Sequence, residues 1–427
     1  MAADGPAPAQ ATGARRLRRI ALSIAALAVV PLACGSCLVR ELGGNFTHAP
    51  QEWREALSPA ARRLVEQSFA DLSSPPVDYH THLVGLGDSG SGAWVNPKMR
   101  SWLHPVLRVK FSIYLSACAV EEIEHADAQF LDRLVALASE GPRPGRHALL
   151  AFDRNWRADG TVNDEESEFF VPNDYVFAVV KRHPDLFSPV ASIHPYRPDA
   201  LAELDRCARN GARLLKWIPA AMGIDPADAR CDPFYDRMRE LGVALLSHAG
   251  REEAIDVEEA QKLGNPLRLR RALDHGVKLI VAHCASLGED EDLDRDDRAP
   301  ASSFDLFLRM MDEKRYDGLL FGELSAVTDC LRDRRPIGVL LERTDLHGRL
   351  VNGSDYPIPA VNCLVWTKSF VKWGYLADDE RELLDEIYGV NPILFDFVLK
   401  RRLKHPTTGA SFPPSVFEAN PAIPLDG

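Results

Sequence analysis

Five histidine and aspartate residues of this sequence follow short apolar runs that have the composition of β-strands. They are His80, His82, His248, His283 and Asp355. Residues 77–82 have the sequence Val-Asp-Tyr-His-Thr-His. Side chains two positions apart in a strand point to the same side. One strand can therefore offer two imidazole nitrogens to a single cation.

An isolated His-x-His pair is not specific, but the other three residues end different runs: Leu-Leu-Ser before His248, Ile-Val-Ala before His283 and Val-Asn-Gly-Ser before Asp355. We therefore predict one metal site with His80, His82, His248 and Asp355 as ligands and His283 close by. Three nitrogens and a carboxylate suit Zn²⁺, and Mn²⁺ or Fe²⁺ is chemically admissible. For His194 and His347 the ordinary role of a buried or capping histidine is expected.

Eight strand-like runs alternate with amphipathic helical patterns along the chain, as in repeated βα units. The runs are 77–79, 147–152, 186–193, 213–218, 243–247, 277–282, 318–324 and 349–352. Eight such units fit a closed (β/α)8 TIM barrel better than an open sheet, because the carboxyl ends of all strands then meet on one face. This convergence is what would bring the five residues together.

We divide the chain into an export or anchor segment (1–45), a helical lead-in (46–75, with a helix over 52–70), the barrel (76–400) and a Pro-rich C-terminal tail (401–427). The stretch 83–146 between the first two strands is too long for one loop and helix, and we expect an insertion over the barrel mouth. From residue 405 the tail is expected to lie on the surface or to lack order.

The N-terminus has the pattern of a secretory signal or signal anchor. Four arginines (Arg15, Arg16, Arg18 and Arg19) precede the uncharged apolar run 20–39, which is long enough to span a bilayer. Cys34 and Cys37 near its end also permit lipoprotein processing, although Pro31 departs from that pattern. The positive-inside rule then places residues from 40 onward outside the cytoplasm, in the cell envelope and tethered to the membrane.

The composition argues for a small-molecule substrate. The chain has 427 residues, a formal net charge of −12 and a pI near 5.6. Nucleic-acid binding requires a basic face, so a general role with nucleic acid is excluded. The six cysteines beyond residue 40 form no CxxC pair. They are expected to be mostly buried small side chains, although an exported chain could pair some of them.

The order His-x-His, His, His, Asp at successive strand ends resembles the amidohydrolase superfamily, and within it the amidohydrolase-related group that contains aminocarboxymuconate semialdehyde decarboxylase. The resemblance covers residues 77–399, including Gly-Ser-Asp-Tyr-Pro at 353–357 and Tyr-Gly-Val-Asn-Pro-Ile-Leu-Phe at 388–395. It implies one divalent ion on His80, His82, His248 and Asp355, with His283 assisting catalysis. It also implies a role for Lys216, since binuclear members bridge two metals with a carboxylated lysine there. One ion is preferred, and two remain open.

A metal-activated water attacking an amide, ester or lactone would follow from such a site, with Asp355 as base and His283 polarising the carbonyl. The alternative on the same site is non-oxidative decarboxylation, making the protein a carboxy-lyase. Arg251 and Arg197 are candidate contacts for a substrate carboxylate. Trp217 and Tyr356 could line the pocket, and Glu323 could orient a ligand.

Overall fold

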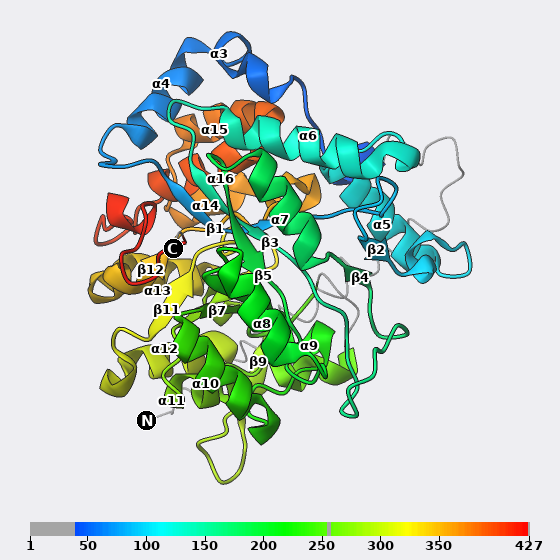
Figure 1. Ribbon diagram of the computed structural model, residues 1–427. Helices are drawn as coiled ribbons and strands as arrows, with labels where there is room; N and C mark the ends of the chain where they lie inside the picture. The colour runs from blue at the N-terminus through cyan, green and yellow to red at the C-terminus, as the bar shows by residue number, and fades with distance from the viewer. Residues whose placement is uncertain (1–38, 254–257, 426–427) are drawn as a thin grey trace, which may run out of the picture.

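The computed structural model describes residues 39–253 and 258–425 of the chain (Figure 1). Eight parallel strands form one sheet, in the order β1-β3-β5-β6-β7-β8-β11-β12. The strands are β1 (Val77–His82), β3 (Arg146–Leu150), β5 (Phe187–Ala191), β6 (Leu214–Trp217), β7 (Ala244–Ser247), β8 (Leu279–Val281), β11 (Leu320–Glu323) and β12 (Leu350–Val351). Each lies on one of the eight predicted runs.

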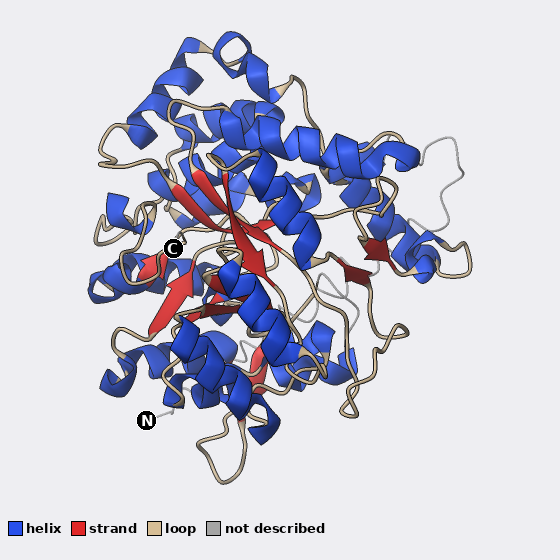
Figure 2. Ribbon diagram, in the orientation of Figure 1, coloured by secondary structure: helices blue, strands red, loops and turns tan. Residues whose placement is uncertain are grey.

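The ends of this sheet meet, so the strands form a nearly closed barrel (Figure 2). The amide of Tyr79 in β1 donates a hydrogen bond to the carbonyl of Asn352, just after β12, at 2.9 Å. Three residues further along β1, the amide of His82 donates to the carbonyl of Tyr356 at 3.0 Å. These bonds complete the ring, and the predicted (β/α)8 barrel is confirmed.

Helices surround the barrel on its outer side (Figure 1). They include α7 (Asn173–Arg182), α8 (Ala200–Arg209), α10 (Asp232–Leu241), α11 (Arg270–Asp274), α12 (Ser303–Asp312), α13 (Arg334–Glu342), α14 (Thr367–Trp373), α15 (Asp378–Val390) and α16 (Pro392–Arg402). In α8 the buried positions Ala200, Leu204, Cys207 and Ala208 form one helical stripe. Helix α10 ends at Gly242, whose φ of 67° is the left-handed conformation that favours glycine at a helix end.

The C-terminal tail differs from the expectation of a surface segment or a disordered one. Ile423 and Leu425 belong to the same buried cluster as the side chains inside the barrel, such as Leu150 and Leu246. The hydroxyl of Tyr79 donates to the carbonyl of Ile423 at 3.0 Å and accepts the amide hydrogen of Asn420 at 2.9 Å. The interior of a barrel must be filled by side chains, and the tail supplies two of them.

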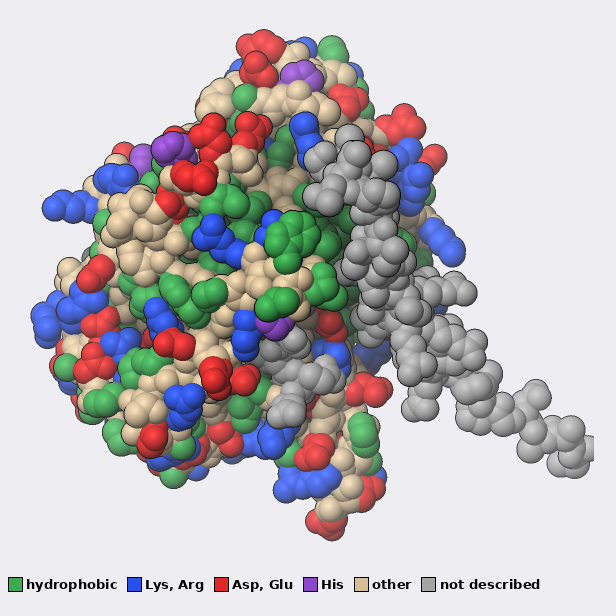
Figure 3. Space-filling view, turned by 90° about the vertical axis from the view of Figure 1, so that its right-hand side faces the viewer, with side chains coloured by type: hydrophobic (Ala, Val, Ile, Leu, Met, Phe, Trp, Pro, Cys, Tyr) green, Lys and Arg blue, Asp and Glu red, His purple; other side chains and the backbone are tan. Residues whose placement is uncertain are grey.

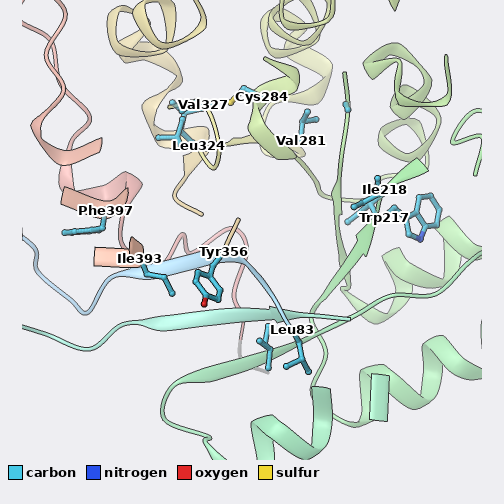
Figure 4. Close-up of a cluster of buried hydrophobic side chains, with 14 of the residues drawn as sticks. Leu83, Trp217, Ile218, Val281, Cys284, Leu324, Val327, Tyr356, Ile393 and Phe397 are labelled. Atoms are coloured by element: carbon cyan, nitrogen blue, oxygen red, sulfur yellow. The ribbon is translucent and has the colours of Figure 1, made fainter. Parts of the chain in front are cut away.

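A second, larger apolar cluster lies between the strands and the helices (Figure 4). Four cysteines are buried in it, as their apolar character predicts: Cys118, Cys207, Cys231 and Cys284.

The predicted lead-in helix over 52–70 is divided into two helices, α3 (Trp53–Ala56) and α4 (Pro59–Phe69). The break occurs where Ser58 caps α4 by accepting the amide hydrogen of Ala61, with Pro59 in the first helical turn.

The stretch after β1 contains β2 (Trp94–Val95), α5 (Pro105–Ala117) and α6 (Ala126–Ser139), and β2 pairs with β4 (Phe169–Phe170). The carboxylate of Asp127 in α6 accepts hydrogen bonds from the glycine- and serine-rich loop that follows β1. Of the predicted export segment (1–45), residues 1–38, with Cys34 and Cys37, lie outside the described residues. Within 39–253 and 258–425, no helix has the length and apolar character needed to cross a membrane.

Candidate metal centre

An irregularity in β1 turns both of its histidines into the barrel. The pairing register of β1 with β3 shifts between Asp78 and Thr81. Tyr79, within the shifted stretch, packs among the interior side chains. His80 and His82 also face inward, with their Nε2 atoms 3.3 Å apart. Because of the bulge, β1 places an apolar side chain in the barrel interior and two candidate ligands at its carboxyl end.

Asp355 completes a group of three with these histidines. Its Oδ1 lies 3.2 Å from Nε2 of His80 and 3.0 Å from Nε2 of His82. Its φ of 60° is in the left-handed region, which a non-glycine residue rarely adopts, and its amide hydrogen bond to the carbonyl of His80 holds it there. Donor atoms around a tetrahedral ion with bonds of about 2.1 Å are about 3.4 Å apart. The three atoms are therefore spaced to surround one cation.

His248, at the end of β7, is a buried histidine with one unpaired nitrogen. Its Nδ1 faces Oε2 of Glu252 at 3.4 Å. Its Nε2 is buried and has no hydrogen-bond partner among the described residues. Leaving a buried polar atom unpaired costs about 1–3 kcal/mol. The ring of His248 lies beside that of His283, with centroids 5.2 Å apart, but its Nε2 is not among the closely spaced donor atoms of His80, His82 and Asp355.

His283, after β8, lies on the other side of the Asp355 carboxylate. Its ring is nearly parallel to that of His80, with centroids 5.3 Å apart, and its Nε2 is 3.7 Å from Oδ2 of Asp355. Nδ1 of His283 lies 2.7 Å from the hydroxyl of Ser325, which itself donates to Glu323. The hydrogen of His283 is thus on Nδ1, and Nε2 has a lone pair.

Glu323, at the end of β11, forms hydrogen bonds with His80 and Ser325. Its Oε2 lies 3.0 Å from Nδ1 of His80 and accepts the Ser325 hydroxyl at 2.6 Å. Its Oε1 accepts the amide hydrogen of Ser325. A carboxylate that accepts Nδ1–H fixes the tautomer with a free Nε2. His80, His283 and Glu323 also form a second group with closely spaced donor atoms, but Glu323 contacts the side of His80 opposite to His82 and Asp355.

The protonation states suit a cation. Burial lowers the pKa of His82, His248 and His283, so their imidazoles are neutral near pH 7. Burial acts to raise the pKa of Asp355, but the electrostatic interaction with His80 and the hydrogen bond with His82 outweigh it and hold this pKa well below its usual range. Neutral imidazoles and an ionised carboxylate are the forms that bind metals.

Lys216, at the end of β6, also points into the site. Its amino group is buried and lies 3.1 Å from Nε2 of His80. Burial lowers its pKa to about 8, although the charges of Asp355, Glu323 and Glu252 act in the opposite direction. A nearby cation would favour the neutral amine further.

The residues predicted to contact the substrate either form ion pairs with acidic residues or are buried away from the metal ligands. Arg197 donates to Asp153 and Asp199 and is not brought together with the ligand set. Arg251 forms an ion pair with Glu253. Trp217 is completely buried and stacks on Phe234 of α10, in the layer between strands and helices (Figure 4). Its neighbour Lys216 faces inward, so Trp217 must face outward, and the prediction that it lines the pocket is wrong.

The other residue predicted to line the pocket, Tyr356, lies in the same apolar layer. Tyr356 is completely buried and packs on Phe130 of α6, with ring centroids 6.0 Å apart. His194 and His347 are satisfied core histidines, as expected: Nε2 of each bonds to a backbone carbonyl, at 2.9 and 3.0 Å.

Several residues at the site have no signal in the sequence. Arg332, in the loop after β11, is buried, donates to Ser286 at 2.6 Å and pairs with Asp329. Its charge acts on both His248 and His283. Burial raises the pKa of Tyr114 in α5, and the charges of Glu252, Glu168 and Asp355 act in the same direction. Arg332 comes from a loop, where no periodic pattern marks the inward-facing positions, and Tyr114 comes from a helix outside the eight βα units.

A parallel barrel with histidine and aspartate donors at the carboxyl ends of its strands defines a class of divalent-metal enzymes. The donor set here fits such an ion by its spacing, its protonation and the unpaired Nε2 of His248. Residues 77–393 match the family model described as Amidohydrolase. The chain belongs to the amidohydrolase family.

Comparison with curated proteins finds no match. Solved structures with a similar chain course include an uncharacterised TIM-barrel protein of Bordetella bronchiseptica (16% identity, TM-score 0.43, covering 73% of this chain and 99% of the other). A putative 2-pyrone-4,6-dicarboxylic acid hydrolase of Pseudomonas putida is similar at 15% identity and a TM-score of 0.41, with coverages of 76% and 98%. A 5-carboxyvanillate decarboxylase of Sphingomonas paucimobilis is similar at 11% identity and a TM-score of 0.43, with coverages of 73% and 96%.

Proposed function

We propose that this protein is a metal-dependent hydrolase that cleaves a small-molecule amide, ester or lactone with an activated water. The observation on which this depends is the arrangement of Asp355. Its Oδ1 lies with the Nε2 atoms of His80 and His82, while its Oδ2 faces Nε2 of His283 at 3.7 Å. One carboxylate oxygen is thus placed to bind a cation and the other to accept a proton.

His80, His82, His248 and Asp355 would hold the ion, with Zn²⁺ the best match to three nitrogens and one carboxylate. When bound, a divalent ion polarises a substrate carbonyl and lowers the pKa of water from 15.7 to about 7. We propose one ion, because Nε2 of His80, Nε2 of His82 and Oδ1 of Asp355 lie 3.0–3.3 Å from one another, as donor atoms around a single ion do. Lys216 then acts as a neighbouring amine and not as a bridge between two ions.

Asp355 would take a proton from the water through Oδ2 as the water oxygen bonds to the acyl carbon. It would then pass that proton to the leaving nitrogen or oxygen as the acyl bond breaks. We propose a role for His283 that differs from the one expected from the sequence. Because its hydrogen is on Nδ1, facing Ser325, its Nε2 accepts hydrogen bonds. His283 is therefore suited to orient the water or to accept a proton, and not to donate a hydrogen bond to a carbonyl oxygen.

Non-oxidative decarboxylation remains the second candidate, and Arg332 favours it. This buried guanidinium donates to the hydroxyl of Ser286, three residues after His283, at 2.6 Å. A substrate carboxylate is a natural partner for an arginine at that position. Asp329 already pairs with Arg332, so a carboxylate would have to share the guanidinium with it.

Product analysis separates the two reactions. The metal-loaded protein is screened against amides, esters, lactones and aromatic or unsaturated carboxylates in ¹⁸O-labelled water. Hydrolysis predicts one labelled oxygen in the acid product, whereas release of CO₂ without incorporation of label would refute the proposal. Asp355→Asn should abolish turnover, and Asp297→Asn, an exposed aspartate paired with Arg295, is the matched control that should retain it.

We also propose that the protein is exported and tethered to the membrane by its N-terminal segment. The basic cluster at 15–19 and the apolar run 20–39 support this topology. A reporter fused after residue 45 should be active only outside the cytoplasm. A reporter active in the cytoplasm would refute the topology without affecting the proposed chemistry.

A further inference from the structure

The segment that contains β2 and α5 differs in charge from the rest of this acidic chain. Positions 89–120 contain no aspartate or glutamate but four basic residues, Lys98, Arg100, Arg108 and Lys110. The whole chain has a formal net charge of −12. One of these, Lys110, pairs with the carboxylate of Glu168 at 4.0 Å, and the other three give this surface a local charge of +3 that attracts anions.

The same segment exposes large apolar side chains. Trp102, Leu103 and Val106 are 68%, 88% and 51% exposed. They are three of the five large hydrophobic residues that stand out as exposed in the described part of the chain. The guanidinium of Arg108 lies 3.9 Å from the ring centre of Trp102, so the basic and apolar groups are interleaved.

This surface lies on the side of the molecule where α5 and β2 are found (Figure 1). Viewed from that side, hydrophobic side chains gather in the middle of the face with Lys and Arg among them, and Asp and Glu lie mainly towards its edges (Figure 3). Clustered apolar groups on a protein surface usually mark a site of interaction.

The start of the described chain is attached to the same helix. The amide of Gly44 donates to the hydroxyl of Ser116 in α5 at 3.1 Å, and the carbonyl of Gly43 accepts the amide hydrogen of Asn362 at 2.6 Å. The apolar run 20–39 ends only a few residues before these contacts. Ser116 and Val106 are ten positions apart in α5, or about 15 Å along the helix. A membrane segment formed by that run would leave α5 beside the bilayer.

We infer that residues 97–110, here termed the docking segment, bind the surface of a phospholipid bilayer that contains anionic lipids. Trp102, Leu103 and Val106 would enter the headgroup region, where aromatic and aliphatic side chains are favourable. Lys98 and Arg100 would contact lipid phosphates while their aliphatic stems lie along the apolar groups. This contact is distinct from an N-terminal anchor and fixes which face of the barrel is turned to the membrane.

Hydroxyl-radical footprinting of the full chain in vesicles tests the inference, because it reports the exposure of individual side chains. Leu201 of α8, which is 44% exposed, is the internal reference. We expect the labelling of Leu103 relative to Leu201 to fall by about fivefold or more from phosphatidylcholine vesicles to vesicles rich in phosphatidylglycerol. Arg100→Glu should restore the labelling, whereas Arg209→Glu, the same change on exposed α8, should not.

Equal labelling of Leu103 in the two kinds of vesicle would overturn the inference. Protection that is present without lipid and that increases with protein concentration would indicate a second copy of the chain and would also overturn it. The measurement does not depend on turnover, so its outcome is separate from that of the proposed hydrolase activity.

Discussion

The hydrogen bonds of Glu323 predict that metal affinity depends on a residue that need not contact the metal. Glu323 is fully buried, and its Oε2 accepts from Nδ1 of His80 and from the hydroxyl of Ser325. In Glu323→Gln one of the two carboxylate oxygens becomes an NH₂ group. If this group takes the Oε2 position, it faces three donors, which are Nδ1 of His80, the hydroxyl of Ser325 and the amide of His283. If the amide is flipped, it faces the amide hydrogen of Ser325 instead.

Either orientation leaves a buried donor unpaired, which costs about 1–3 kcal/mol. The change also removes the negative charge that holds the hydrogen on Nδ1 of His80 and keeps Nε2 free. Loss of such a partner typically weakens metal binding about tenfold to hundredfold. We therefore expect Glu323→Gln to bind Zn²⁺ at the centre about tenfold to hundredfold more weakly.

Competition with a chromogenic chelator measures the affinity, and the melting temperature of the metal-free protein shows whether the fold persists. Glu313→Gln is the matched control, since Glu313 forms ion pairs with Arg270 and Arg315 on the outer surface. A folded Glu323→Gln protein with affinity within about twofold of the wild type would refute the reasoning. Complete loss of binding at intact stability would instead make Glu323 a direct ligand, as its grouping with His80 and His283 allows.

Three further predictions concern protons, packing and metal stoichiometry. Burial lowers the pKa of His194 to about 3 from 6.5, so between these pH values the unfolded chain binds one proton more than the folded chain. The free energy of unfolding should therefore fall by up to about 1.4 kcal/mol per pH unit on acidification. Urea titrations with chelator present should show a shallower fall in His194→Gln, and an unchanged slope would contradict the assignment. Ile423→Ala should lower stability by about 2–4 kcal/mol in denaturant titrations, because the side chain is 1% exposed inside the barrel; a loss below about 1 kcal/mol would contradict this packing. Lys216→Ala should leave one equivalent of metal by elemental analysis, whereas a change from two equivalents to one would establish a bridged pair of ions.

The sequence alone determined the eight strands and the residues at their ends. Each strand of the barrel is a short apolar run, and apolar runs that alternate with amphipathic helices allow few folds other than a parallel barrel. That architecture brings His248 and Asp355 to the same face as the His-x-His pair, although they are far apart along the chain. The family resemblance added the expected roles of these residues.

Only the tertiary structure decided which way individual side chains face. Strict alternation along β1 would put Asp78 on the same side as His80 and His82, but the bulge between Asp78 and Thr81 changes the pattern. The same uncertainty made Trp217 a candidate for the pocket, although it faces the helices. A register shift of one residue turns every later side chain of the strand to the opposite face of the sheet. The sequence does not reveal such a shift.

Contacts between distant segments could not be predicted from the sequence either. Ser325 and Arg332 reach the centre from the loop after β11, and Ile423 enters the barrel from a tail that has no apolar periodicity. Loops and tails lack the repeating hydrogen-bond pattern that gives helices and strands a characteristic spacing. Their positions depend on which cavities the rest of the fold leaves to be filled, and only the folded structure contains that information.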